Sequence, residues 1–186
     1  MEFQFQNLRD ESARGTDVAS EIREFCLKII KDFYGIDYTK EWHADLDSLL
    51  LDGDGNWFSR ENRGSFYHVR DGAGAIIATG GVYDLKRKPS TGQRIAKRYG
   101  DDAEICQIVR VYLDPDFRGA GLGSQIATRL ERDALSLEYD VAYLHADARA
   151  PKALSFWKKC GYSDFGSFSY PSKTGMDTSV DFEKLL

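Results

Sequence analysis

Residues 114 to 125 read DPDFRGAGLGSQ, a turn followed by an arginine and three glycines at every second position. The stretch lies between an apolar, strand-like run, Ile105 to Leu113, and an amphipathic, helix-like run, Ile126 to Leu135. Glycine has no Cβ, so it lets a backbone adopt left-handed conformations and approach a ligand closely. The junction therefore predicts a backbone that comes close to a bound group at the start of a helix.

Two standard phosphate-binding motifs do not fit this junction. The P-loop requires a lysine where this chain has Ser124, and the dinucleotide pattern GxGxxG would end on Ser124 or Ile126. The physics behind those motifs still applies, because unpaired N–H groups and the positive end of a helix dipole would face outward. Together with Arg118 and the Ser124 hydroxyl, the junction predicts a diphosphate site. A tight turn that needs glycine for geometry alone is the alternative.

The sequence around the glycines carries a resemblance to a known family. Arg118-Gly-Ala-Gly121-Leu-Gly123 resembles the [QR]-x-x-G-x-[GA] pattern of the GCN5-related N-acetyltransferase (GNAT) superfamily, and VYLDP precedes it. ALSFWKKCGY, residues 153–162, is similar to the family's A-x-x-F-Y-x-x-x-G-F. The resemblance covers roughly residues 65–165 and implies that acetyl-coenzyme A binds. It implies two sets of cofactor-binding residues: backbone against the pantetheine arm at Val111, Tyr112 and Leu113, and a diphosphate cradle at Arg118, Gly119, Ala120, Gly121, Leu122, Gly123 and Ser124.

The periodicity of apolar residues predicts the elements around this motif. Strands are expected over residues 2–8, 66–70, 75–83, 104–113, 140–146, 162–170 and 178–184, and helices over 17–34, 44–51, 121–137 and 151–159. This order predicts one α/β domain over residues 1–186, a mixed central sheet of about six to seven strands with helices on both faces. The resemblance implies a GNAT-like fold, with an acetyl-coenzyme A cleft where the strands 104–113 and 140–146 splay apart.

One segment between the expected strands is rich in cations and poor in apolar residues. It runs from Leu85 to Gly100 and carries Lys86, Arg87, Lys88, Arg94, Lys97 and Arg98. We expect a solvated, mobile loop here, and the alternative is a cationic wall for a phosphate or an acidic group.

Composition limits the classes of partner. Apolar residues make up 42% and charged residues 30% of the chain, and the net charge is −5. These values are ordinary for a soluble globular protein, disfavour nucleic-acid binding and favour a cationic acceptor. No signal peptide opens the chain and no apolar run approaches the ~18 residues of a membrane span, so we expect a cytoplasmic protein without a membrane partner. A homodimer, common among proteins that resemble this chain, stays an open expectation.

The cysteines and a calcium-like stretch argue against a metal. Cys26, Cys106 and Cys160 lie far apart inside apolar runs without C-x-x-C spacing, which is typical of reduced core residues. The stretch DGDGN begins like a calcium loop, but Trp57 and Arg63 stand where the turn glycine and the bidentate glutamate are required. No metal is expected.

Acetyl transfer to an amine needs a base for the nitrogen and an acid for the leaving thiolate. The resemblance implies a tyrosine as the acid, but this chain has Trp157 at that position. The family's frequent asparagine falls on Ala150, and its frequent glutamate falls on Gln107. The usual catalytic groups are therefore missing at three positions.

Other residues are candidates for the catalytic role. His145, near the end of the strand after the motif helix, is predicted to be the base or a substrate contact; the alternative is a histidine satisfied by backbone. Glu104 is a second candidate base, acting through water, unless it is a rim charge. Tyr112 and Tyr143 are candidate proton donors, although tyrosines on strands more often serve packing.

The sequence thus predicts an N-acetyltransferase that moves an acetyl group from acetyl-coenzyme A directly to an amine of a small molecule or peptide. Direct transfer is favoured because no cysteine lies in surroundings that would activate it. Aminoglycoside, polyamine, amino acid, peptide N-terminus and lysine side chain all stay open as acceptors. One alternative is a catalytically silent acyl-coenzyme A-binding or regulatory module. Another is a nucleotide-binding protein of different fold, which the failed motifs disfavour.

Overall fold

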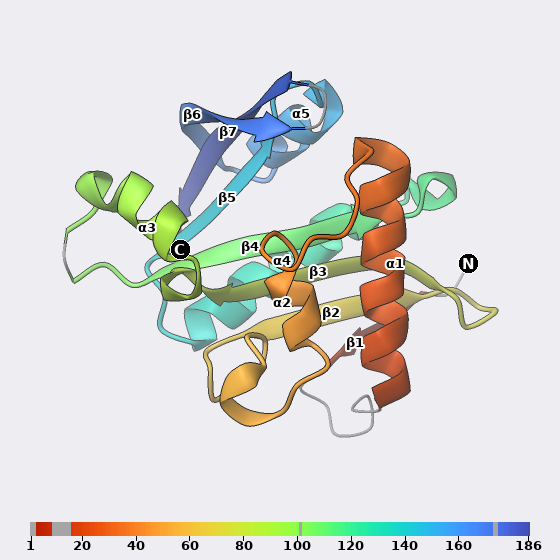
Figure 1. The fold of residues 1–186 in the computed structure, drawn as a ribbon. Helices are drawn as coiled ribbons and strands as arrows, with labels where there is room; N and C mark the ends of the chain where they lie inside the picture. The colour runs from red at the N-terminus through yellow and green to blue at the C-terminus, as the bar shows by residue number, and fades with distance from the viewer. Residues whose placement is uncertain (1–2, 9–15, 101, 173–174) are drawn as a thin grey trace.

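A seven-stranded sheet forms the centre of the structure (Figure 1), a computed structural model that describes residues 3–8, 16–100, 102–172 and 175–186. The strands are β1 (Gln4–Asn7), β2 (Ser65–Arg70), β3 (Ile76–Asp84), β4 (Ile105–Leu113), β5 (Val141–Asp147), β6 (Ser163–Ser172) and β7 (Gly175–Leu185). Their order across the sheet is β1-β2-β3-β4-β5-β7-β6, and every neighbouring pair is antiparallel except β4 and β5, which are parallel.

Helices and short 3₁₀ turns connect these strands. The helices are α1 (Thr16–Tyr34), α2 (Ala44–Ser48), α3 (Pro89–Ile95), α4 (Leu122–Ser136) and α5 (Pro151–Lys159). The 3₁₀ turns are η2 (Gly53–Gly55), η3 (Leu85–Arg87), η4 (Ala96–Arg98) and η5 (Pro115–Phe117). Within the part of the chain that the structure describes, no helix combines the length and the apolar character needed to cross a bilayer.

Helix α1 covers one face of the sheet and α4 covers the other, as Figure 1 shows. Ile22, Cys26 and Ile30 recur at helical spacing on α1 and are buried in one core cluster. On the opposite face, Ile126 of α4 packs so closely on β3 that a Cβ at Gly80 would overlap its side chain. Two apolar layers therefore enclose a single sheet.

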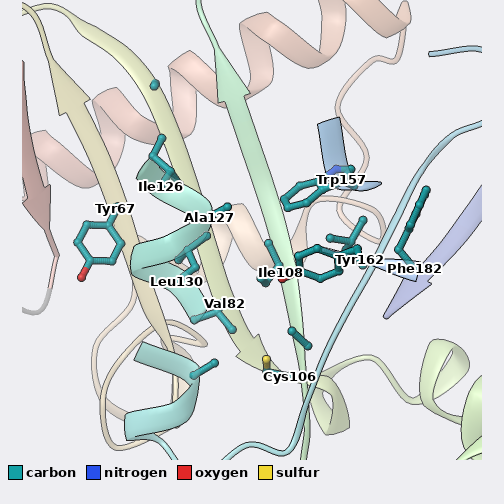
Figure 2. Close-up of a cluster of buried hydrophobic side chains, with 14 of the residues drawn as sticks. Tyr67, Val82, Cys106, Ile108, Ile126, Ala127, Leu130, Trp157, Tyr162 and Phe182 are labelled. Atoms are coloured by element: carbon teal, nitrogen blue, oxygen red, sulfur yellow. The ribbon is translucent and has the colours of Figure 1, made fainter. Parts of the chain in front are cut away.

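Figure 2 shows the cluster of buried side chains on the α4 face of the sheet. It continues from Ile126 and Leu130 of α4 across Ile108 of β4 to Trp157 and Tyr162. Helix α5 thus shares its core with α4. Packing on both sides of β4 holds the strand that carries the glycine junction.

The α/β architecture predicted from sequence, a mixed sheet with helices on both faces, is confirmed. The expected helix over residues 44–51 is shorter, ending at Ser48. The prediction of a mobile loop over residues 85–100 is wrong, because η3, α3 and η4 occupy this segment. Pro89 is the first residue of α3, and two arginines of the segment bind carboxylates of β7, Arg94 with Asp181 and Arg98 with Glu183. Such distant partners are not visible in the local sequence.

Candidate active site

Strands β4 and β5 pair at one end and then part. Their ladder covers only Ile105–Gln107 against Val141–Tyr143, and Figure 1 shows β5 and β7 rising away from β4 beyond that point. In the part of the chain that the structure describes, no strand pairs with the β5 side of residues 108–113. Backbone groups left without a ladder partner can bind an extended, amide-bearing ligand as an added strand would.

A bulge lies in β4 where the two strands separate. The register between β3 and β4 shifts between Thr79 and Gly81, and Arg110 has a left-handed φ of 54°. The Thr79 hydroxyl donates a 2.9 Å hydrogen bond to the Arg110 carbonyl. Since a bulge redirects the side chains beside it, the Arg110 guanidinium leaves the strand to bind the buried Asp45 carboxylate.

A cavity of about 600 Å³ lies between the parted strands. Residues 109–112 of β4 form one wall and residues 144–147 of β5 form the other. Aromatic side chains that are far apart in the sequence complete the cavity wall. Trp42 contacts Tyr170 of β6 edge-on, with ring centroids 6.2 Å apart. The cavity thus has a backbone-rich side along β4 and an aromatic side at the β6–β7 hairpin.

The glycine junction forms the start of α4, and its three glycines have two different roles. Gly119 and Gly121 have left-handed φ values of 86° and 77°, and a Cβ at either would meet nothing within 4 Å. A Cβ at Gly123 would lie 3.2 Å from Phe156 of α5. Backbone conformation therefore requires the first two glycines, and helix packing accounts for the third. The turn leaves open space in front of its backbone.

The side chains of the junction differ in what they offer a ligand. Arg118 is exposed and stacks 4.7 Å from the Phe33 ring, without an ion pair in the described residues. Leu122 is fully buried, whereas Ser124 is exposed in the first turn of α4. Leu122 can therefore offer an anion only its backbone N–H group, and Ser124 can offer its hydroxyl as well.

The structure separates the residues predicted to bind the cofactor into two groups. Val111 and Tyr112 line the cavity, whereas Leu113 and residues 118–124 lie outside its lining, at the end of β4 and the start of α4. The two groups adjoin along the chain, so an extended ligand would run from the cavity along the end of β4 to the turn.

His145 lines the cavity from β5 and is accessible from it. Desolvation by the surrounding protein is the main effect that lowers the pKa of its imidazole, to about 4. The Asp181 carboxylate opposes this shift, and the Arg94, Arg110 and Lys88 cations add to it. The ring is therefore neutral near pH 7 and able to accept a proton.

Glu104, the second candidate base, lies at the opposite end of β4 and does not line the cavity. Its carboxylate binds Arg63 and, at 3.1 Å, Lys86. The hydrogen bond from Arg63 is the main cause of its lowered pKa, and Lys86 adds to the effect. A carboxylate so engaged is a poor base, and the structure does not bring it together with His145.

The two candidate proton donors on strands are also placed differently. Tyr112 lines the cavity, and its hydroxyl accepts a 3.3 Å hydrogen bond from Arg110. Burial raises its pKa to about 12. Tyr143 is fully buried, lies outside the cavity lining and donates its hydroxyl proton to Asp181 at 2.7 Å. Of the two, only Tyr112 faces the space where a substrate would bind.

The three departures from the family's pattern all line the cavity. Trp157 is buried and packs edge-on against Phe156 and Tyr162, with centroids 4.9 and 5.2 Å away. Gln107 accepts a 3.1 Å hydrogen bond from Tyr83, and Ala150 caps α5 without a side-chain bond. These positions shape the wall of the cavity and supply no acid or base.

Two polar features of the cavity wall were not predicted as such from the sequence, although Lys88 belongs to the basic segment for which a cationic wall was the alternative. One is the buried pair of Arg110 and Asp45, signalled only by a charge in the middle of the apolar run IVRVY. The other is Lys88, whose ammonium lies 5.4 Å from the Trp57 ring centroid and 3.5 Å from the Glu41 carbonyl oxygen. Burial lowers the pKa of Lys88. Trp42, in the segment before α2, also lines the cavity.

Comparison with known proteins identifies relatives of this architecture. The model of the acetyltransferase (GNAT) family matches residues 23–162. An uncharacterized N-acetyltransferase of Dictyostelium discoideum is 30% identical over 67 residues, a match that spans 36% of this chain and only 31% of that relative.

Solved structures extend the likeness over the whole chain. Arabidopsis thaliana NAA60 in complex with acetyl-CoA has a TM-score of 0.71 at 14% identity, covering 100% of this chain and 99% of that one. A GNAT-family acetyltransferase from Staphylococcus aureus has a TM-score of 0.68 at 15% identity, with coverage of 100% and 99%. The ribosomal-protein-S18-alanine N-acetyltransferase from Escherichia coli has a TM-score of 0.63 at 11% identity, with coverage of 99% and 94%. At these identities the likeness concerns the fold.

Proposed function

The chain belongs to the acetyltransferase (GNAT) family, and from this membership we propose that it transfers the acetyl group of acetyl-coenzyme A directly to an amine of a small molecule or peptide. One observation carries the proposal: β4 and β5 part after three paired residues and open a cavity along β4, the strand whose end is followed by the glycine turn. We also propose that residues 1–186 form a single N-acetyltransferase domain, because the two largest core clusters pack on the two faces of one sheet.

The residues present fit a coenzyme A thioester. Val111, Tyr112 and Leu113 would offer the β5-facing backbone of β4 to the pantetheine amides, since no strand in the described chain takes that side. The diphosphate would rest on the backbone from Gly119 to Ser124, where left-handed glycines leave space in front of a helix N-terminus. Arg118 would add a charge-assisted hydrogen bond. When bound, acetyl-coenzyme A supplies an acetyl group activated as a thioester.

His145 is the base in this proposal. An amine must lose a proton as it attacks, and the group that takes it must be unprotonated at working pH. The depressed pKa of His145, about 4, keeps its imidazole neutral, and its place in the cavity wall gives an acceptor amine access to it. Glu104 is not carried into the mechanism, because it lies outside the cavity in ion pairs with Arg63 and Lys86.

Tyr112 is the proposed donor of a hydrogen bond to the leaving thiolate. Trp157 supplies no such proton, and the Tyr143 hydroxyl is already donated to Asp181. Direct transfer fits the thiols, because burial raises the pKa of Cys26 to about 12 and that of Cys106 further. A thiol that stays protonated is a poor nucleophile, so a covalent acetyl-enzyme is not part of the proposal.

Purified protein titrated with acetyl-coenzyme A, followed by thiol release across a panel of amines, tests the proposal. The panel should contain polyamines, amino acids, aminoglycosides and peptides with free N-termini or lysines. Saturable binding with amine-dependent release is expected. Binding without release on any amine would instead identify a catalytically silent acyl-coenzyme A-binding module, for which the residues at positions 107, 150 and 157 argue. No binding would reject both functions.

A further inference from the structure

The proposed base, His145, lies beside a hydrogen-bond network that joins Asp181 of β7, Tyr143 of β5 and Arg94 of α3. His145 of β5 is the register partner of Asp181 on β7. Asp181 is buried, and its carboxylate accepts hydrogen bonds from Arg94 at 2.5 and 2.9 Å and from the Tyr143 hydroxyl at 2.7 Å. An ionised carboxylate has only acceptor capacity, so the direction of these three bonds is fixed.

The Tyr143 hydroxyl determines what His145 does. A phenol carries one proton, and Tyr143 donates it to Asp181. The same oxygen accepts a 2.6 Å hydrogen bond from Nη2 of Arg94. Only acceptor capacity then remains for the next neighbour, Nδ1 of His145 at 3.4 Å. In a neutral imidazole, a hydrogen bond to this oxygen forms only when Nδ1 carries the proton, and Nε2 is then left as the acceptor.

Arg94 reaches this network from α3, the segment that the sequence suggested was a mobile loop. Its guanidinium stacks 3.8 Å from the Phe168 ring centroid, and the same ring packs edge-on against His145 at 5.4 Å. Arg94 thus contacts two neighbours of the histidine, Asp181 of β7 and Phe168 of β6. A guanidinium offers donors in a planar fork and no acceptor, which suits it to join a carboxylate and a phenol.

Charged groups on β7, α3 and β4 and in the segment before α3 act on His145. Asp181 of β7 favours the imidazolium, whereas Arg94 of α3, Arg110 of β4 and Lys88 before α3 oppose it. Tyr143, on β5 itself, is held as a phenol because burial and the Asp181 hydrogen bond raise its pKa. Without Arg94, the Asp181 charge would face His145 with less compensation.

We propose that Arg94 is a positioning residue for acetyl transfer: through Asp181 and Tyr143 it fixes His145 as the Nδ1–H tautomer, with Nε2 as the proton acceptor. The inference rests on the proposed role of His145 as the base. It also assigns a function to α3, since the contacts of Arg94 tie that helix to the strands beside the cavity.

A matched control exists one helical turn further along. Arg98 binds a carboxylate of the same strand, Glu183, shares it with a tyrosine hydroxyl from Tyr99, and stacks on an aromatic ring of β6, Phe165. No contact joins it to His145 in the described residues. Arg98→Gln therefore removes an equivalent set of interactions without touching the network of the histidine.

Nitrogen-15 NMR titration of the imidazole rings tests the proposal without any substrate. In the wild type we expect His145 in the Nδ1–H tautomer, titrating near pH 4. In Arg94→Gln its midpoint should rise by about one to two pH units, the usual effect of exposing a histidine to an uncompensated carboxylate. Arg94→Lys, which keeps the charge, should retain most of the low midpoint, and Arg98→Gln should leave it unchanged.

Tyr143→Phe provides a second route if Arg94→Gln does not fold, because it removes only the hydroxyl. It should abolish the preference for the Nδ1–H tautomer. An Nε2–H tautomer in the wild type, or an unmoved midpoint and tautomer in the variants, would overturn the proposal. In active enzyme, the acidic limb of kcat/KM should shift upward in Arg94→Gln; a lower kcat with an unmoved limb would mean a purely structural role. The NMR pattern without turnover on any amine would reject the proposed function while leaving the tautomer assignment intact.

Discussion

The Arg110 guanidinium binds the Asp45 carboxylate through two hydrogen bonds of 2.7 Å, one from Nε and one from Nη2. Asp45 is 1% exposed, and Arg110 also donates to the Trp42 carbonyl at 2.9 Å. Because Arg110 is the bulge residue of β4, this pair joins α2 and the loop before it to the point where β4 leaves β5. The cleft therefore depends on a contact between two distant segments.

Removing one partner of this pair should cost much of the protein's stability. Asp45→Asn or Arg110→Met leaves a buried charge without compensation, and we expect the free energy of unfolding to fall by about 3–5 kcal/mol. Urea denaturation measures it. Arg23→Ala is the control, because Arg23 pairs with the partly exposed Asp47 and such pairs contribute about 0–1 kcal/mol. A loss no larger than that of the control would show that the buried pair does not hold the cleft.

How much the sequence could predict depends on the range of each interaction. The glycine turn was predictable because left-handed φ values at Gly119 and Gly121 are a local property of glycine. The core faces of α1 and α4 follow from apolar spacing within each helix. The Arg110–Asp45 pair joins residues 65 positions apart, and Arg94 meets Asp181 across 87. Such pairings arise only when the sheet assembles, so no local pattern announces them.

Replacing His145 with glutamine should lower kcat/KM for the acceptor amine by about 10²–10⁴-fold, the usual contribution of a general base. The pH profile is more specific. Because the pKa of His145 is depressed to about 4, the wild-type rate should lack an acidic limb centred near 6.5, the ordinary histidine value. The wild-type enzyme should lose activity only as the pH falls toward 4 and His145 becomes protonated. Steady-state kinetics from pH 4.5 to 9 measure this; an acidic limb near 6.5, or no loss in His145→Gln, would exclude His145 as the base.

Tyr112→Phe removes the hydroxyl proposed to stabilise the leaving thiolate and leaves the ring in place. We expect kcat to fall by about 10–100-fold, the range for the loss of one hydrogen bond to a charged group. The affinity for acetyl-coenzyme A should change little, because the proposed backbone contacts of residue 112 remain. Calorimetry and pre-steady-state thiol release separate the two effects. Equal losses of affinity and rate would indicate a binding role for this hydroxyl.

Arg118→Ala should weaken acetyl-coenzyme A binding by about tenfold or more, since a hydrogen bond to a charged group contributes about 1.5–3 kcal/mol. Arg129→Ala is the matched control: Arg129 lies on α4 two turns from the glycine junction, where it stacks on Phe5 at 4.0 Å. Gly121→Val should weaken binding as well, because a β-branched residue is strained at a φ of 77°. Calorimetry with folded protein measures the affinities. Equal affinities for Arg118→Ala and Arg129→Ala would place the diphosphate elsewhere.

The last prediction concerns His68, which is buried in the sheet away from the cavity. Its Nε2 lies 2.8 Å from Oε1 of Gln6, and its Nδ1 has no hydrogen-bond partner in the described residues. Burial lowers its pKa to about 4; Arg70 adds to the shift and Glu21 opposes it.

In the unfolded chain the same imidazole titrates near its ordinary value of 6.5. Between pH 6.5 and about 4 the unfolded state therefore binds one more proton than the folded state, and His68 should lower the free energy of unfolding by about 1.4 kcal/mol for each pH unit of acidification. Above pH 6.5 its effect is constant. Urea denaturation of the wild type and His68→Gln at several pH values isolates this slope, because His43 and His145 titrate equally in both proteins. Parallel stability curves between pH 4.5 and 6.5 would show that the buried histidine accepts its proton without unfolding.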